Sequence, residues 1–262
     1  MNSTLAFLLV FRLNRAASRY WSARHYWGDI VAQIRSFVGG IIVHGDHDRF
    51  HRDEAIRWTA AFAISTMDLL RDEVDIRTDN YAGILNEKQI ATLRAQRHPP
   101  LYAADQIRFN TKHVFHVDSS TPMGISMSRT QEMDMLEHQL NTMIWCGGGM
   151  ERIKATPLPM VYVSHLRTFL ILNLVVLPYI FGPSWGWITI PIVALSGFAW
   201  MGIESAAMEV ERPFFKNRVN SLNMNGFILG LLTTIQQQIK NHADYEMDQT
   251  NGTGTVSVVR RA

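Results

Sequence analysis

The sequence contains a single cysteine, Cys146, among its 262 residues. One cysteine excludes an intramolecular disulfide and a paired-thiolate metal site of the CxxC type. We expect Cys146 to pack as a small buried apolar side chain, because a free thiol is more often buried than nucleophilic. The glycines at 147–149 indicate a break in a helix rather than a phosphate-binding loop, since no Walker pattern accompanies them.

An excess of charge of one sign is also missing. The chain has 25 Lys and Arg against 23 Asp and Glu, a formal net charge of +2. This balance, without a basic run that contains aromatic residues, does not favour nucleic acid as a partner. The N-terminus has neither the basic start nor the small-residue cleavage site of a signal peptide. We therefore expect no nucleic-acid partner and no cleaved signal.

What the sequence does have is an apolar start. Residues 2–11 are almost entirely apolar, and four arginines follow them: Arg12, Arg15, Arg19 and Arg24. Ten helical residues rise about 15 Å, whereas the hydrocarbon core of a bilayer is about 30 Å thick. We therefore expect this segment to be the inner half of a membrane helix whose upstream half is missing from the chain.

Two further apolar regions, 157–182 and 187–203, are separated by a short break at 182–186. Such a short connection joins neighbouring, roughly antiparallel helices. The break carries no charge, whereas the outer flanks are basic through Arg152, Lys154, Arg167, Arg212, Lys216 and Arg218. The positive-inside rule then predicts a membrane hairpin over 157–203 with both flanks in the cytosol or its topological equivalent.

The rest of the chain is more polar and has helical periodicity. Apolar spacing predicts amphipathic helices at 55–70, 87–96, 131–145 and 225–242, and no alternating run indicates a strand. Residues 97–122 mix loop signals with short apolar pieces. The predicted fold is therefore an all-α membrane protein. Its expected parts are an inner helix end at 1–11, a cytosolic helical region at 12–156, the hairpin at 157–203, cytosolic helices at 204–245 and a disordered tail at 246–262.

Three patches are similar to one known family. They are residues 8–28 (LLVFRLNRAASRYWSARHYWG), 151–162 (ERIKATPLPMVY) and 202–214 (GIESAAMEVERPF). Their order, spacing and position relative to the apolar segments resemble the bestrophin-type anion channels of plants, algae, fungi and bacteria. The resemblance covers about residues 2 to 240.

The resemblance implies a pentamer with a single axial pore that conducts chloride and other weakly hydrated monovalent anions passively. In such channels a narrow neck is lined by three residues one helical turn apart, and this register falls on Ser3, Phe7 and Phe11. The spacing of four residues places all three on one helix face. A second constriction, nearer the cytosol, aligns with Gln131. The resemblance implies no cofactor, no metal and no enzymatic activity, and a location in the plasma membrane or an organelle membrane such as the thylakoid.

Two features near these motifs have their own expectations. Several animal members carry a calcium site just after the PF dipeptide, but here Lys216 and Arg218 stand where acidic ligands would be needed, so we expect no calcium gating. The four arginines after residue 11 could raise the local anion concentration below the neck. Equally, they could pair with acidic residues or anchor the helix at the interface.

Alternative functions remain open at this point. The segment His44–His51 gathers three histidines and two aspartates and could hold a divalent metal for hydrolysis, although it matches no established metal-hydrolase spacing. A chain without a first membrane helix could also be a subunit that does not conduct, in which case restoring upstream sequence should rescue the current. Some bacterial relatives are thought to pass cations.

Overall fold

The computed structural model describes residues 2–71, 78–117, 122–215 and 220–251. All the regular secondary structure in these ranges is helical, which agrees with the all-α expectation. The α-helices are α1 (Asn2–His44), α2 (Arg49–Leu70), α3 (Glu87–Ala95), α4 (Pro99–Val114), α5 (Met123–Ala155), α6 (Met160–Trp185), α7 (Thr189–Glu211) and α8 (Met224–Asn251). Two short 3₁₀ helices, η1 (Thr78–Tyr81) and η2 (Gly186–Ile188), complete the set.

The chain divides into two compact units, which are described separately. The first contains residues 1–27 and 148–222, and the second contains residues 28–147 and 223–262. The first unit therefore contains the three apolar segments together with the helical ends that border them. The sequence instead predicts boundaries at residue 11, where the first apolar run ends, and at residue 156, just before the second apolar region begins.

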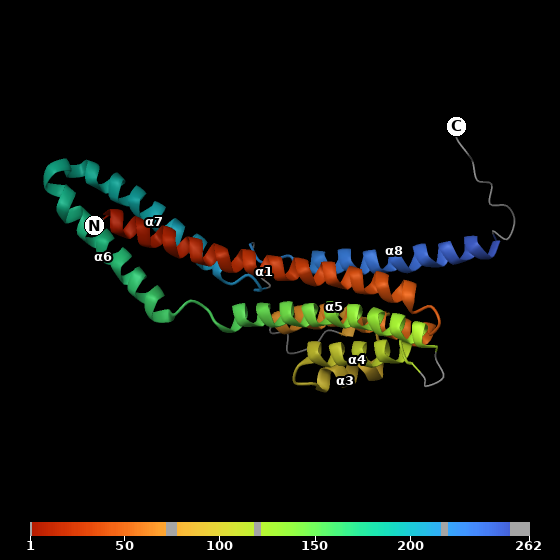
Figure 1. Ribbon diagram of the computed structural model, residues 1–262. Helices are drawn as coiled ribbons and strands as arrows, with labels where there is room; N and C mark the ends of the chain where they lie inside the picture. Colours follow the sequence, from red (N-terminus) through yellow and green to blue (C-terminus); the bar gives the residue numbers. More distant parts are fainter. Residues whose placement is uncertain (1, 72–77, 118–121, 216–219, 252–262) are drawn as a thin grey trace. The chain divides into compact units, whose positions relative to one another are not determined.

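In the first unit, α6 and α7 form a helical hairpin that η2 joins (Figure 1). The turn is made at Gly186, whose φ of 52° lies in the left-handed region that favours glycine. Helix α6 continues through Pro183 to Trp185, so the break begins later than the predicted 182–186. Helix α7 continues past residue 203 to Glu211 and ends before Pro213, a residue that cannot continue a helix.

The start of α1 packs on this hairpin through an apolar cluster of Leu5, Leu9, Leu166 and Leu170. Each of these four side chains is at most 3% exposed. Burial of leucine side chains stabilises such a contact by about 1.5–3 kcal/mol per side chain. The contact holds the first turns of α1 beside α6.

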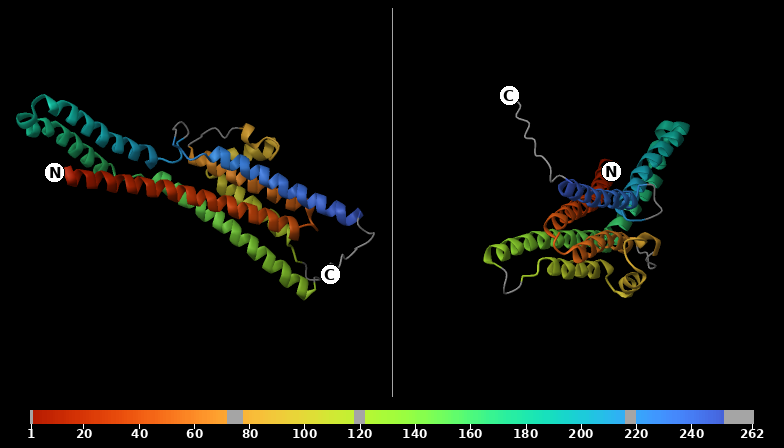
Figure 2. Two further views of the ribbon diagram at one scale, coloured as in Figure 1. Left: turned by 90° about the horizontal axis from the view of Figure 1, so that it is seen from above. Right: turned by 90° about the vertical axis from the view of Figure 1, so that its right-hand side faces the viewer.

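In the second unit, α2 packs against α4 on one side and α8 on another (Figure 2). Asp48 caps the N-terminus of α2 by accepting a hydrogen bond from the backbone N–H of His51. Helix α4 occupies much of the segment 97–122 in which we expected loops. Pro99 and Pro100 form its first turn, where the missing N–H costs nothing, so the prolines that suggested a loop start a helix instead.

Two other expectations were wrong. Helix α5 runs without interruption through the glycines at 147–149, where tertiary packing of the buried Met143, Cys146 and Met150 outweighs the poor helix propensity of glycine. Helix α8 extends to Asn251, so residues 246–251 are helical rather than part of a disordered tail, and 252–262 lie outside the described residues. Cys146 is buried as expected, and its burial, with a smaller contribution from Asp29, raises the pKa of its thiol to about 11.

Candidate functional site

The first turns of α1 have two distinct faces. Leu5 and Leu9 are 0% and 1% exposed, whereas Phe7 and Phe11 are 70% and 47% exposed. Phe7 and Phe11 lie four residues apart and therefore share one side of the helix. The Ser3 side chain lies outside the described residues. Two large exposed aromatic rings on one side of a helix form a surface available to another molecule or another copy of the chain.

The other side of α1 carries a buried ion-pair network. Arg12 has a side chain only 1% exposed and forms an ion pair with Glu204 of α7. It also faces Glu211 of α7, with 3.8 Å between Nη2 and Oε2. Arg167 of α6 donates from Nε to the second oxygen of Glu204 at 2.7 Å. One arginine of α1 thus connects two carboxylates of α7, and one of those carboxylates also binds α6.

Arg19 joins α1 to the end of α5. Its guanidinium donates to the backbone oxygens of Thr156 at 2.6 Å and of Ile153 at 2.5 Å. The last carbonyls of a helix have no intrahelical donor, and a cationic side chain there also interacts favourably with the helix dipole. Arg19 therefore caps the C-terminus of α5.

These contacts join the three sequence patches to one another. Arg12 and Arg19 come from the first patch, Ile153 and Thr156 from the second, and Glu204 and Glu211 from the third. Glu211 also accepts a hydrogen bond from the backbone N–H of Leu158 at 3.3 Å, which joins the second patch to the third. All three patches meet in the first unit.

The contacts of two of the four arginines are of the pairing and anchoring kind that the sequence left open. Arg12 is buried and paired with carboxylates, and Arg19 donates to backbone oxygens. Arg24 is half-buried and also takes part in an interaction. Arg15 is exposed and keeps its role as a candidate for anion attraction.

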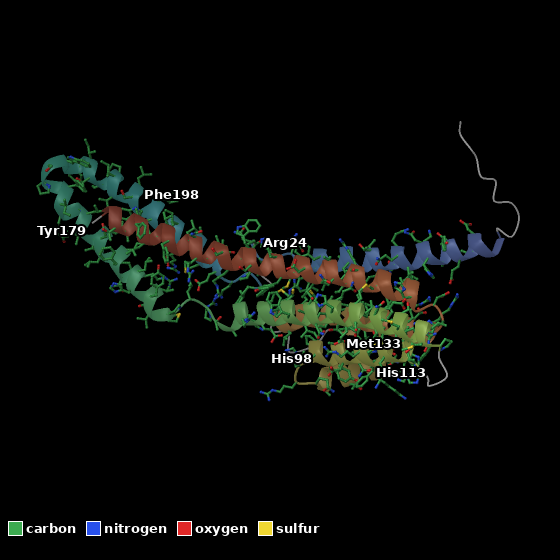
Figure 3. The ribbon with its side chains drawn as sticks, in the orientation of Figure 1. Arg24, His98, His113, Met133, Tyr179 and Phe198 are labelled. Atoms are coloured by element: carbon green, nitrogen blue, oxygen red, sulfur yellow. The ribbon has the colours of Figure 1, made fainter. Side chains whose placement is uncertain are left out.

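The outer surface of the hairpin is apolar and open. Tyr179 of α6 and Phe198 of α7 are 78% and 80% exposed (Figure 3). Within the described residues, the hairpin segment Met160–Glu211 is long and apolar enough to cross a membrane. Only 28% of its most apolar 18-residue stretch is buried. A core helix of a soluble protein would be mostly buried. The exposed apolar side chains are those that lipid would cover.

Gln131 lies on α5 with an exposed side chain. One turn to either side, Met127 and Met135 are 64% and 43% exposed. The next residue, Glu132, faces Nδ1 of His44 at 3.4 Å, which holds this part of α5 against the end of α1. The predicted calcium-site positions Lys216 and Arg218 lie outside the described residues.

The histidines of the segment 44–51 have separate partners. His47 bonds to the backbone oxygen of Val114, and His51 Nδ1 lies 2.7 Å from Asp48 Oδ2 and stacks on the ring of His113. Within the described ranges, no three His, Cys, Asp or Glu side chains converge in a way that could hold a metal ion. The metal-hydrolase alternative therefore gains no support from the geometry.

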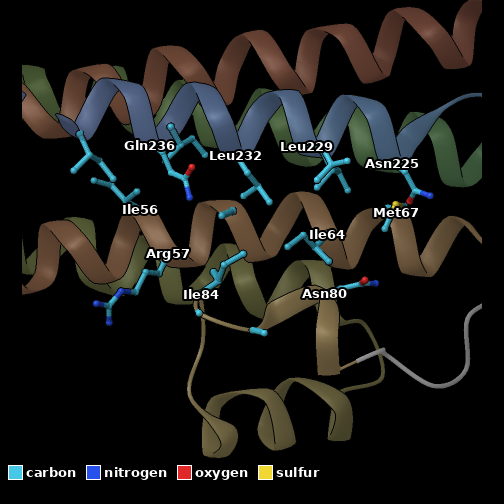
Figure 4. A pocket seen from close by; sticks show the side chains of 16 residues that line it. Ile56, Arg57, Ile64, Met67, Asn80, Ile84, Asn225, Leu229, Leu232 and Gln236 are labelled. Atoms are coloured by element: carbon cyan, nitrogen blue, oxygen red, sulfur yellow. The ribbon is translucent and has the colours of Figure 1, made fainter. Parts of the chain in front are cut away.

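A cavity of about 690 Å³ lies in the second unit between α2 and α8 (Figure 4). Its lining is mainly isoleucine, leucine and alanine, as at Ile64 and Leu232. Its one charged lining residue, Arg57, forms an ion pair with Glu54.

The comparisons with known proteins agree on one family. A family model described as Bacterial/Fungal Bestrophin protein matches residues 1–240. A voltage-dependent anion channel-forming protein of Nostoc sp. is 30% identical over 214 residues, which cover 80% of this chain and 66% of the relative. The chloroplastic voltage-dependent chloride channel 2 of Arabidopsis thaliana is 25% identical over 213 residues, which cover 80% of this chain and 49% of the relative.

The chain therefore spans slightly less than two thirds of the Nostoc relative and about half of the Arabidopsis one. A solved structure of a bacterial bestrophin homolog from Klebsiella pneumoniae superposes with a TM-score of 0.76 at 21% identity. The match covers 90% of this chain and 83% of that one, and it establishes the fold.

Proposed function

Because this chain belongs to the bestrophin family, we propose that it is a subunit of an anion channel, a membrane protein in which several copies surround one pore. The observation that carries the proposal is the two-sided start of α1, where Phe7 and Phe11 are exposed opposite a buried and ion-paired face. The relatives that are named as anion or chloride channels support the choice of ion. We further propose a homopentamer, with both hairpin helices crossing the bilayer.

In the proposed pentamer, the Phe7 and Phe11 rings form successive constrictions of a neck, and Ser3 forms a wider or wetter ring beyond them. An apolar neck admits only ions that shed part of their water, and this cost falls as an anion becomes larger and its charge more spread. The edges of phenylalanine rings are weakly positive and give a passing anion partial stabilisation. Weakly hydrated anions such as iodide should therefore pass more easily than chloride.

Two more positions complete the proposed pathway. Gln131, between the exposed Met127 and Met135, is the proposed second constriction on the cytosolic side. Arg15 is the proposed anion-attracting residue below the neck, because it is exposed whereas Arg12 is buried. A non-conducting subunit and a cation-permeable channel are the competing outcomes, and ion-substitution recordings separate all three.

The test is a double substitution, Phe7→Ala with Phe11→Ala, recorded in planar bilayers with iodide and chloride. Removing both rings widens the neck so that hydrated ions fit, and the iodide-to-chloride permeability ratio should fall toward one. Phe198→Ala is the matched control, since it removes an equally exposed ring from the hairpin. An unchanged ratio in the double variant would contradict the neck assignment. Absence of anion current from the unsubstituted protein would contradict the channel proposal itself.

A further inference from the structure

Arg12 follows directly after Phe11, yet it lies on the buried side of α1. We propose that Arg12, held by Glu204 and Glu211, is a positioning residue that sets the rotation of α1 about its own axis. That rotation decides the direction in which Phe7 and Phe11 point. The inference rests on the proposed channel function. It adds that Arg12, Glu204 and Glu211, which do not line the neck, affect the selectivity of the channel.

The two carboxylates are anchored without help from α1. Residues 204 and 211 are seven apart, so they lie two turns apart on one face of α7. Glu204 binds Nε of Arg167 at 2.7 Å, and Glu211 accepts a hydrogen bond from the backbone of Leu158 at 3.3 Å. The negative charges therefore keep their positions, and the guanidinium of Arg12 must meet them.

The apolar contacts of α1 cannot set the rotation equally well. Leu5 and Leu9 pack through non-directional contacts that tolerate a small turn of the helix. The ion pair between Arg12 and Glu204 is buried, and turning Arg12 away would leave a buried charge without compensation. A rotation of one tenth of a turn moves a side-chain tip about 5 Å from the helix axis by about 3 Å. That displacement is large compared with the width of an ion pathway.

The experiment compares Glu204→Gln with Glu209→Gln in the full chain. Both remove one carboxylate charge from α7, and the carboxylates that meet Arg12 are those of Glu204 and Glu211. We expect Glu204→Gln to lower the iodide-to-chloride permeability ratio by about threefold or more, while Glu209→Gln leaves it unchanged. Adding Arg12→Gln to Glu204→Gln removes the uncompensated charge but also the residue that sets the rotation, so the ratio should stay lowered.

A stabilising role alone would give a different result. It would lower the number of assembled channels, measured by size-exclusion chromatography, but leave the permeability ratio of the remaining channels unchanged. If Glu204→Gln fails to assemble, Arg12→Lys serves in its place, because lysine keeps the buried charge but replaces the guanidinium that meets both carboxylates with a compact ammonium group. An assembled variant of either kind with a normal ratio overturns the inference.

A second readout does not depend on conduction. Phe11→Cys places a thiol at the proposed neck, where mild oxidation should form disulfides between neighbouring copies. The parent protein, in which Cys146 is buried, measures the background of disulfide-joined subunits. We expect Glu204→Gln to change the yield of joined subunits by about threefold or more, because residue 11 turns away from its counterpart. An unchanged yield, or no joining at all, overturns the inference. A changed yield in a protein without anion current keeps the inference and refutes the channel proposal.

Discussion

Replacing Gly149 with alanine tests how closely α1 and α5 pack in the first unit. A Cβ at this position would lie 2.8 Å from Cζ of Tyr26 and 2.9–3.0 Å from two further ring carbons. Ordinary carbon contacts begin near 3.5 Å. The tyrosine ring therefore occupies the space that an alanine needs, and a glycine is required here in spite of its poor helix propensity.

The magnitude follows from two opposing effects. Alanine in a helix interior is favoured over glycine by about 0.5–1 kcal/mol. Forcing an extra methyl group into a filled space costs about 1–3 kcal/mol. Gly148, one residue away, is exposed and has no atom within 4 Å of the added Cβ, so Gly148→Ala should have only the favourable effect. The two variants should differ by the steric cost alone, about 1–3 kcal/mol.

Thermal unfolding of the detergent-solubilised protein, followed by circular dichroism, measures this difference. For a chain of this size we expect the two midpoints to lie roughly 2–12 °C apart, at about 2–4 °C per kcal/mol. Combining Gly149→Ala with Tyr26→Ala should lower the stability by less than the sum of the two separate changes, because without the Tyr26 ring the added methyl group at 149 has nothing to clash with. If Gly149→Ala stabilises the protein as much as Gly148→Ala does, the close approach of Tyr26 is refuted.

Two further predictions concern ionisable groups of the second unit. Cys146, buried and with a pKa raised to about 11, should resist alkylation by iodoacetamide at pH 8 in the folded protein and react in urea, and equal rates in both conditions would contradict its burial. Burial raises the pKa of Asp48, but the hydrogen bonds and the charge of His51 together outweigh burial and leave the pKa lowered. The stability that Asp48 contributes is therefore complete above its unfolded pKa of 3.8 and is lost as the pH falls through the lower folded value. Asp48→Ala should cost about 1 kcal/mol at pH 7 and progressively less as the pH falls below 4, measured by thermal unfolding, whereas a cost that grows in acid would reverse the assigned sign.

Local sequence patterns predict the helical class and the main helices. Long apolar runs ended by arginines, and periodic apolar positions such as those of 55–70, are local patterns that depend on neighbours a few residues away. For the same reason Phe7 and Phe11 could be placed on one face from their spacing alone. Helix α4 was not predicted, because proline is common both in loops and in the first turn of a helix, so Pro99 and Pro100 do not distinguish the two.

The partners of the charged residues in the three patches become known from the packing of the helices, not from the sequence. Arg12 and Glu204 are 192 positions apart in sequence, and no local pattern indicates that they form a buried pair. The same holds for Arg19, whose acceptors are backbone oxygens near residue 155 that every helix end presents. Gly149 gives a further example, since the ring of Tyr26 that excludes a side chain comes from another helix. Contacts between distant segments depend on packing in three dimensions, and that packing buries Arg12 against carboxylates of another helix.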